Sequence, residues 1–507
     1  MAVREIKQAT KLGNRLTAQD ASFLYGESFG GPTHIGLLSF FEGEIAYERL
    51  YQHFAQRLHL LPRYTQRLAL VPFNLAHASL EDDPNFNLAN HVKYHQLPAG
   101  TSEADLIKAA IRIFEPPLSR TQPLWQIHAF TGLEGGRTGM LWKIHHCLVD
   151  GVSAMELTTV AFDFRPDAPP PEPPPEKPRT PRPVPSLAEN LLNAIQDLMD
   201  EQVNAAWRAQ EMLRKPKELA EQTRQLSEAA QALSQMMGRP IVAAPWNIGL
   251  CSQHRSFARA HYSFAEFRAI RNALGGTIND VVLTMLSEAA ARYLKQHDCK
   301  PGNLPLRIGC PVNVRREDQH GTLGNRVSMM FPELPALPMD LVKRMEAVKQ
   351  ETERIKTERL PQGLELLSEA TSLFPPSIIG VTSSLATFSL DAAMMLSRLA
   401  PSIPVTGVPG FGINFVATNV PGVQTPQYLA RHLMIDQVGL IPCAGSLGYG
   451  VVITSYNQNI DFGLMAEPTM MPDVNLMKSL LDEVFAEFYQ TAQRVSQQPE
   501  NARAASV

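Results

Sequence analysis

A proline-rich segment at 166–185 divides this 507-residue chain and limits what it can fold into. Eleven of its twenty residues are proline, at positions 166, 169, 170, 171, 173, 174, 175, 178, 181, 183 and 185. Such a stretch favours extended polyproline II and cannot build a hydrophobic core. The sequence therefore predicts an N-terminal unit at 1–165, a stiff linker at 166–185 and a C-terminal unit at 186–507. Recognition by an SH3-type domain is an alternative role for the linker.

Strand and helix signals alternate in the N-terminal unit. Apolar runs predict strands at 34–41, 126–130 and 139–146, and helical periodicity predicts helices at 47–60 and 104–114. The N-terminal unit is therefore expected to mix helices and strands throughout its length.

The C-terminal unit opens with helical periodicity from 186, which Pro216 interrupts and which ends near 237. Both signs of charge lie on the polar face of this stretch, which favours packing on its own domain over lying on a membrane. Further helices are predicted at 264–274 and 279–296, and strands at 307–312, 412–419, 447–454 and 459–464.

Composition excludes several classes of function. Hydrophobic residues make up 44% and charged residues 19%, and the net charge of -4 gives no basic field for nucleic acid. The five cysteines include no CxxC pair, so neither a metal site nor a disulfide framework is indicated. Residues 1–16 lack the apolar core of a secretory signal, and prolines interrupt the longest uncharged stretch, 399–430. We expect a cytoplasmic protein, soluble or peripheral at the inner membrane or at lipid inclusions.

The stretch His145-His146-Cys147-Leu148-Val149-Asp150-Gly151 is the strongest candidate for a site. Histidine is the common side chain that takes and returns a proton near neutral pH. If the strand continues through both histidines, their side chains face apart, which weakens a metal interpretation. Asp150 and Gly151 would open the next helix, and an N-cap is the plain alternative for Asp150. We interpret Cys147 as a packing residue rather than a nucleophile.

This HHxxxDG stretch resembles the active-site motif of the CoA-dependent acyltransferase superfamily, and the rest of the chain resembles one family within it. Bacterial wax ester synthase/acyl-CoA:diacylglycerol acyltransferases carry similar short motifs in the same order. The matching motifs are LTAQD at 16–20 with Glu27, PTHIG at 32–36, PLW at 123–125, ND at 279–280, PVNVR at 311–315, GN at 324–325, NVPG at 419–422 and DFG at 461–463. Thr33 and Asn313 depart from the family pattern, which expects Met and Ser.

The resemblance implies an α/β, two-domain chloramphenicol-acetyltransferase-like fold with the active site at the domain interface. It implies that His146 is the general base, that His145 supports it, and that Asp150 orients the loop that continues into Gly151. A hydrogen-bonded structural histidine is the alternative role for His145. Asn279 would lie near the oxyanion, with a helix N-cap as its alternative role. The resemblance also suggests that Arg120 and Trp125 serve packing, and that Asp461 and Gly463 form a turn or strand end at the domain interface.

The resemblance also implies the substrates. Long-chain acyl-CoA would be the co-substrate, with no bound cofactor, and diacylglycerol or a long-chain fatty alcohol would accept the acyl group. Two alternatives stay open. One is a superfamily acyltransferase with another hydroxyl acceptor, and the other is a non-catalytic lipid-binding or lipid-droplet protein.

Overall fold

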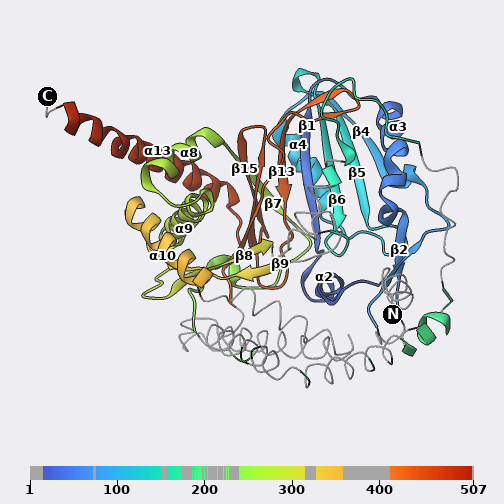
Figure 1. Ribbon diagram of the computed structural model, residues 1–507, viewed down its shortest axis with the longest axis horizontal. Coiled ribbons are helices and arrows are strands. Elements are labelled where there is room, and N and C mark those ends of the chain that lie inside the picture. The colour runs from blue at the N-terminus through green and yellow to red at the C-terminus, as the bar shows by residue number, and fades with distance from the viewer. Residues whose placement is uncertain are drawn as a thin grey trace.

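Two mixed β-sheets, each covered by helices, organise the chain (Figure 1). The computed structural model describes residues 15–71, 76–149, 157–158, 160–173, 239–313, 327–357 and 412–504, with scattered positions between 185 and 227. A short hairpin of β2 (Gln66–Ala69) and β3 (Ser79–Asp82) forms a third, small sheet.

The first sheet has six strands in the order β12-β13-β1-β6-β5-β4. Their bounds are β1 His34–Phe41, β4 Val92–Thr101, β5 Trp125–Leu133, β6 Thr138–His145, β12 Tyr428–Leu429 and β13 His432–Leu440. Helix α3 (Tyr47–Arg57) packs its buried Leu50 and Phe54 on one face. Helix α4 (Glu103–Phe114) packs Leu106 and Phe114 on the other. Helix α2 (Ala18–Gly30) lies at the end of the sheet where β1 begins (Figure 1).

The second sheet has seven strands in the order β10-β8-β11-β14-β15-β7, with β9 added beside β8. Their bounds are β7 Ser256–Ser263, β8 Pro305–Asn313, β9 Val327–Met330, β10 Glu333–Pro335, β11 Phe415–Val420, β14 Tyr449–Tyr456 and β15 Asn459–Ala466. One face is covered by α8 Phe264–Leu274, α9 Ile278–Gln296, α10 Leu341–Thr357 and α13 Val474–Ala504, which share the largest hydrophobic core with it.

Strands β12 and β13 belong to the C-terminal half of the chain but complete the first sheet, where β13 pairs antiparallel with β1. The sequence predicted that the C-terminal unit at 186–507 would be separate, and this segment corrects that expectation. The segment joins the first sheet through long-range pairing, because the apolar edge of β1 needs a partner strand. The boundary at 166–185 stays a prediction, since residues 174–184 lie outside the described residues.

The two sheets approach each other closely where β13 crosses β14 and β15. A Cβ atom at Gly463 would collide with the carbonyl oxygen of Gly439, and one at Gly439 would lie 2.8 Å from Val452 Cγ2. A continuous hydrophobic core joins α4 and β13 to Val452 and Met465 of the second sheet. Glycine at 439 and 463 therefore allows backbone to approach backbone at this seam.

The predicted helices between 186 and 237 lie largely outside the described residues. Among the described positions, Leu191 is partly buried, whereas four other large apolar side chains are exposed: Leu192, Ile195, Met199 and Val203. The expected packing of this stretch on its own domain stays a prediction. In the described part of the chain, none of the helices has the length and apolar character needed to cross a bilayer.

Candidate active site

The histidine pair lies at the end of β6, where the strand gives way to a turn. The last ladder pair of β1 and β6 joins His34 to His145, so His146 is already outside the strand. The strand ends before His146, so the alternation expected within a strand does not apply to this pair. Both imidazoles instead contact α2, His145 at Glu27 and His146 at Phe23. Residues four apart share one face of a helix, so one face of α2 holds both histidines.

The imidazole of His145 is buried, and protein groups engage both of its nitrogens. The Cys147 backbone N–H donates to Nδ1 at 3.1 Å, which leaves Nε2 as the protonated nitrogen. Nε2 lies 3.1 Å from Glu27 Oε1 and 3.4 Å from Thr33 Oγ1. With both nitrogens bound in this way, the ring holds the turn that carries His146. The Cys147 thiol is buried too, which raises its pKa well above the usual range and fits packing.

Glu27 is held by three donors. Besides His145, the guanidinium of Arg120 donates to Oε2 at 2.9 Å and the Thr33 backbone N–H donates to Oε1 at 3.1 Å. Burial alone would raise the pKa of Glu27, but the hydrogen bonds from His145, Arg120 and Thr33 outweigh it and lower the pKa to about 2. Arg120 also donates to the Leu24 carbonyl of α2 at 3.0 Å. The packing role suggested for Arg120 from the sequence is therefore incomplete, because its guanidinium makes specific hydrogen bonds.

Replacing Glu27 with glutamine is expected to remove an acid-dependent part of the stability. A carboxylate whose folded pKa is about 2 stabilises the fold fully above its usual pKa of 4.5 and loses that contribution as pH falls from 4.5 towards 2. The contribution is on the order of 1–3 kcal/mol at pH 7. Urea unfolding at several pH values should show a gap between the wild type and Glu27→Gln that closes below pH 4.5. The exposed Glu48→Gln is the control, and a gap independent of pH would contradict this account.

His146 is half-buried, and its ring stacks face to face on Phe23 with 3.8 Å between centroids and 5° between planes. Its backbone N–H donates to the Thr33 carbonyl at 3.3 Å. The sequence did not point to Phe23, because no helix was predicted at 18–30 and therefore no shared helix face for Phe23 and Glu27.

Two buried basic side chains lie on β1 and β6, the two strands that pair up to His145. Lys143 Nζ donates to the Ile113 carbonyl at 2.9 Å and also to that of Pro116, while His34 Nε2 contacts the Phe114 carbonyl. Burial lowers the pKa of Lys143 to about 7 and holds that of His34 well below its usual value. These contacts satisfy carbonyls at the end of α4, from which the chain runs on to Arg120.

Of the remaining candidates, Asn279 lies within the described residues, whereas Asp150 and Gly151 do not. Asn279 lies in the first turn of α9, but the N-cap is Thr277, whose side chain and Asp280 form a reciprocal capping box. The predicted N-cap role of Asn279 is therefore wrong, and its role near an oxyanion stays a prediction. Asp150 and Gly151 lie outside the described residues.

The end of α2 reaches the second unit, since a Cβ at Gly31 would lie 3.1 Å from Arg255 Nη2.

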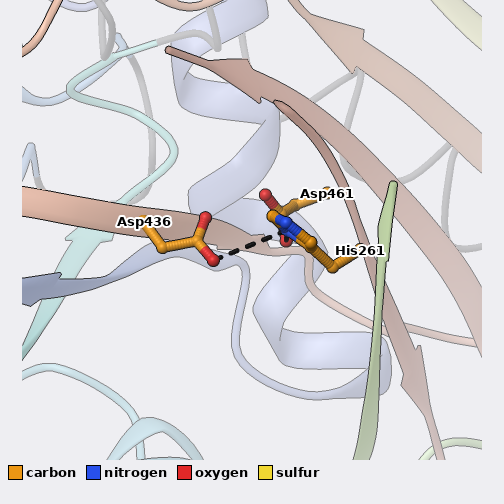
Figure 2. Close-up of side chains that lie close together, drawn as sticks. All are labelled: His261, Asp436 and Asp461. Carbon is orange, nitrogen blue, oxygen red and sulfur yellow. Dashed lines mark hydrogen bonds and ion pairs between the residues drawn. The ribbon is translucent and has the colours of Figure 1, made fainter. Parts of the chain in front are cut away.

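Asp461 of the DFG stretch lies inside β15 rather than at a turn, and it does hold the domain interface. Its Oδ1 accepts from Arg259 Nε at 2.8 Å and lies 3.0 Å from His261 Nδ1. Asp436 Oδ2, from β13 of the first sheet, lies 3.5 Å from the same nitrogen. Figure 2 shows the three side chains close together. In the part of the chain that is described, only this trio has a metal-ligand arrangement. Arg259 also binds Asp436 and Glu103, so its guanidinium already supplies the positive charge there.

Comparisons with known proteins agree along nearly the whole chain. A model described as the wax ester synthase/diacylglycerol acyltransferase catalytic domain matches residues 16–282, and its C-terminal counterpart matches 323–488. A probable diacylglycerol O-acyltransferase of Mycobacterium tuberculosis is 27% identical over 490 residues, which cover 95% of this chain and 97% of that protein. A putative diacylglycerol O-acyltransferase of Mycobacterium bovis matches with the same identity and coverage.

Solved structures confirm the predicted two-domain α/β fold. The wax ester synthase/diacylglycerol acyltransferase from Marinobacter aquaeolei VT8 matches with a TM-score of 0.59 and 22% identity, covering 94% of this chain and 100% of that one. A variant starter condensation domain of rhizomide synthetase, in complex with C8-CoA and Leu-SNAC, matches with a TM-score of 0.57 and 13% identity over 95% and 94% of the two chains.

Proposed function

Because the chain belongs to the wax ester synthase/diacylglycerol acyltransferase family and is an acyltransferase, we propose that it moves a long-chain acyl group from acyl-CoA to diacylglycerol, a long-chain fatty alcohol or both. The relatives' names supply the acceptor class, and a related fold in complex with C8-CoA supports the donor. No bound cofactor is needed for this chemistry.

His146 acts as the general base in this proposal. It takes the proton of the acceptor hydroxyl as the oxygen attacks the thioester carbonyl. A C–O bond forms, the tetrahedral oxyanion collapses, the C–S bond breaks, and the imidazolium returns the proton to the CoA thiolate. The observation that supports the assignment is the placement of the pair: His146 is half-buried immediately beyond the strand, next to a buried His145 whose two nitrogens are bound by protein groups.

The other residues position this base. His145 fixes the turn through the Cys147 N–H, while Glu27 and Arg120 fix His145. Asp150 would orient the loop by a hydrogen bond or an ion pair, with Gly151 opening the next helix. Asn279 would donate towards the oxyanion. We place the reaction in the cytoplasm at a membrane or lipid-inclusion surface, because both proposed acceptors are lipids.

Free thiol released from palmitoyl-CoA tests the proposal directly. Parallel reactions contain hexadecanol, dioleoylglycerol or no acceptor. Release that depends on an acceptor is the expected result, and the two rates rank the acceptors. If the folded protein releases no thiol with either acceptor, the proposed substrates are wrong. The alternatives are then another hydroxyl acceptor or a non-catalytic lipid-binding role.

A further inference from the structure

Phe23 and His146 form a parallel ring pair that the proposed mechanism has not yet used. The ring centroids lie 3.8 Å apart and the planes differ by 5°. The backbone around Phe23 is well anchored: its carbonyl accepts from Thr33 Oγ1 at 2.8 Å, and the next carbonyl, of Leu24, accepts from Arg120. Thr17 caps the start of the same helix. Phe23 therefore presents its ring face to His146 from a fixed platform.

This geometry favours one protonation state of the imidazole. Two neutral aromatic rings prefer an offset or an edge-to-face arrangement, because their quadrupoles repel when the faces overlap. A cation over the face of a phenyl ring is attracted instead. A close parallel pair is therefore more favourable when the imidazole carries a proton.

We propose that Phe23 is a positioning residue that stabilises the protonated form of His146, the form produced when the acceptor hydroxyl gives up its proton. The inference rests on the proposed function of His146 as the base. An interaction that strengthens as charge develops lowers the barrier rather than tightening ground-state binding. The expected effect of losing it is on kcat, with KM unchanged.

Several charged groups surround the pair and are already bound to one another. On α2, Glu27 binds His145 and Arg120, and Asp20 lies 3.7 Å from Arg63. Arg63 also donates to the Cys147 carbonyl at 3.4 Å. Asp150 lies outside the described residues. Replacing Phe23 leaves all of these charges in place, so a change in the titration of His146 reports on the ring itself.

The test compares Phe23→Leu, which keeps an apolar side chain, with Phe23→Tyr, which keeps the ring. NMR follows the pH titration of the His146 ring proton, identified by its absence from the spectrum of His146→Ala. Phe23→Leu is expected to lower the pH midpoint of His146 by about 0.5–1.5 units and kcat by about 3–30-fold. Phe23→Tyr is expected to keep both at the wild-type values. The matched control is Phe86→Leu, which removes the phenyl ring stacked on His91 at 5.2 Å and should change neither.

Equal midpoints in the wild type and Phe23→Leu would overturn the inference and leave the base assignment standing. If Phe23→Leu fails to fold, Phe23→Tyr decides alone, and a midpoint more than 0.5 units below that of the wild type would also overturn the inference. Full activity in folded His146→Ala would instead remove the proposed function, while the NMR midpoints would still report on the ring pair.

Discussion

Replacing His146 with alanine is expected to lower the rate of acyl transfer about 10²–10⁴-fold while the protein stays folded. The loss follows from its role, since no other group would then take the hydroxyl proton at that position. The fold should tolerate the change because the half-buried ring lies beyond the end of β6, outside the sheet ladder. Thiol release from palmitoyl-CoA at saturating acceptor gives the rate, and thermal unfolding reports on the fold.

Two further histidine variants make that result specific. His254→Ala removes a surface ring whose side chain is 75% exposed and should keep full activity. His145→Ala should lower stability as well as activity, because it removes a donor from Glu27 and an acceptor from the Cys147 N–H. Full activity in a folded His146→Ala protein would show that another group is the base.

Replacing Arg259 with methionine is expected to destabilise the protein by about 3–5 kcal/mol, because it leaves buried carboxylates without their cation. The guanidinium binds Asp461 of its own sheet, Asp436 of the other sheet and Glu103 of α4, and its side chain is only 11% exposed. It also lies over the ring of Phe40, 5.5 Å from the centroid. The midpoint of urea unfolding measures the loss, which should include weaker association of the two sheets.

Arg268→Met is the matched control, since Arg268 makes a hydrogen bond to Gln458 but does not cross the seam. Adding Asp436→Asn to Arg259→Met should recover part of the lost stability, because one of the uncompensated charges is then removed. Unfolding of Arg259→Met at the wild-type urea concentration would mean that the network adds nothing to stability.

The elements that the sequence predicted well carry their own local signals. The strand at 34–41 and the helix at 264–274 were predicted with the bounds that the structure has. Both are short, strongly patterned segments; the strand is followed by a polar turn, and the helix by Gly275 with φ +78°. The strand predicted at 139–146 begins and ends one residue later than β6, Thr138–His145, because nothing in the sequence marks where the ladder with β1 stops.

The elements that were missed depend on distant partners. Helix α2 contains glycine at 26 and 30 and aromatic residues at 23, 25 and 29, so it lacks the regular stripe of a surface helix. Strand β13 is recognisable only by its pairing with β1, about 400 residues earlier in the chain. Arg259 and Asp436 likewise meet only because two sheets approach each other.

The candidate site was predicted in part, for the same reason. The histidine pair is contiguous in sequence, so a motif suffices to find it. Its support comes from Glu27, Arg120 and Phe23, which are more than 20 residues away in the chain and meet it only through α2. Glu27 belonged to a recognised motif, but no local pattern could show that it binds His145.

The crossing of β13 into the first sheet imposes an order on the synthesis of the molecule. Strand β1 remains an open edge until residue 440 has left the ribosome, about 295 residues after the end of β6. At about 5–20 residues per second this takes roughly 15–60 s. Throughout that interval an apolar strand has unpaired backbone groups that other nascent chains could pair with. We therefore expect the nascent chain to be most prone to aggregation during this interval, before β13 covers the edge of β1.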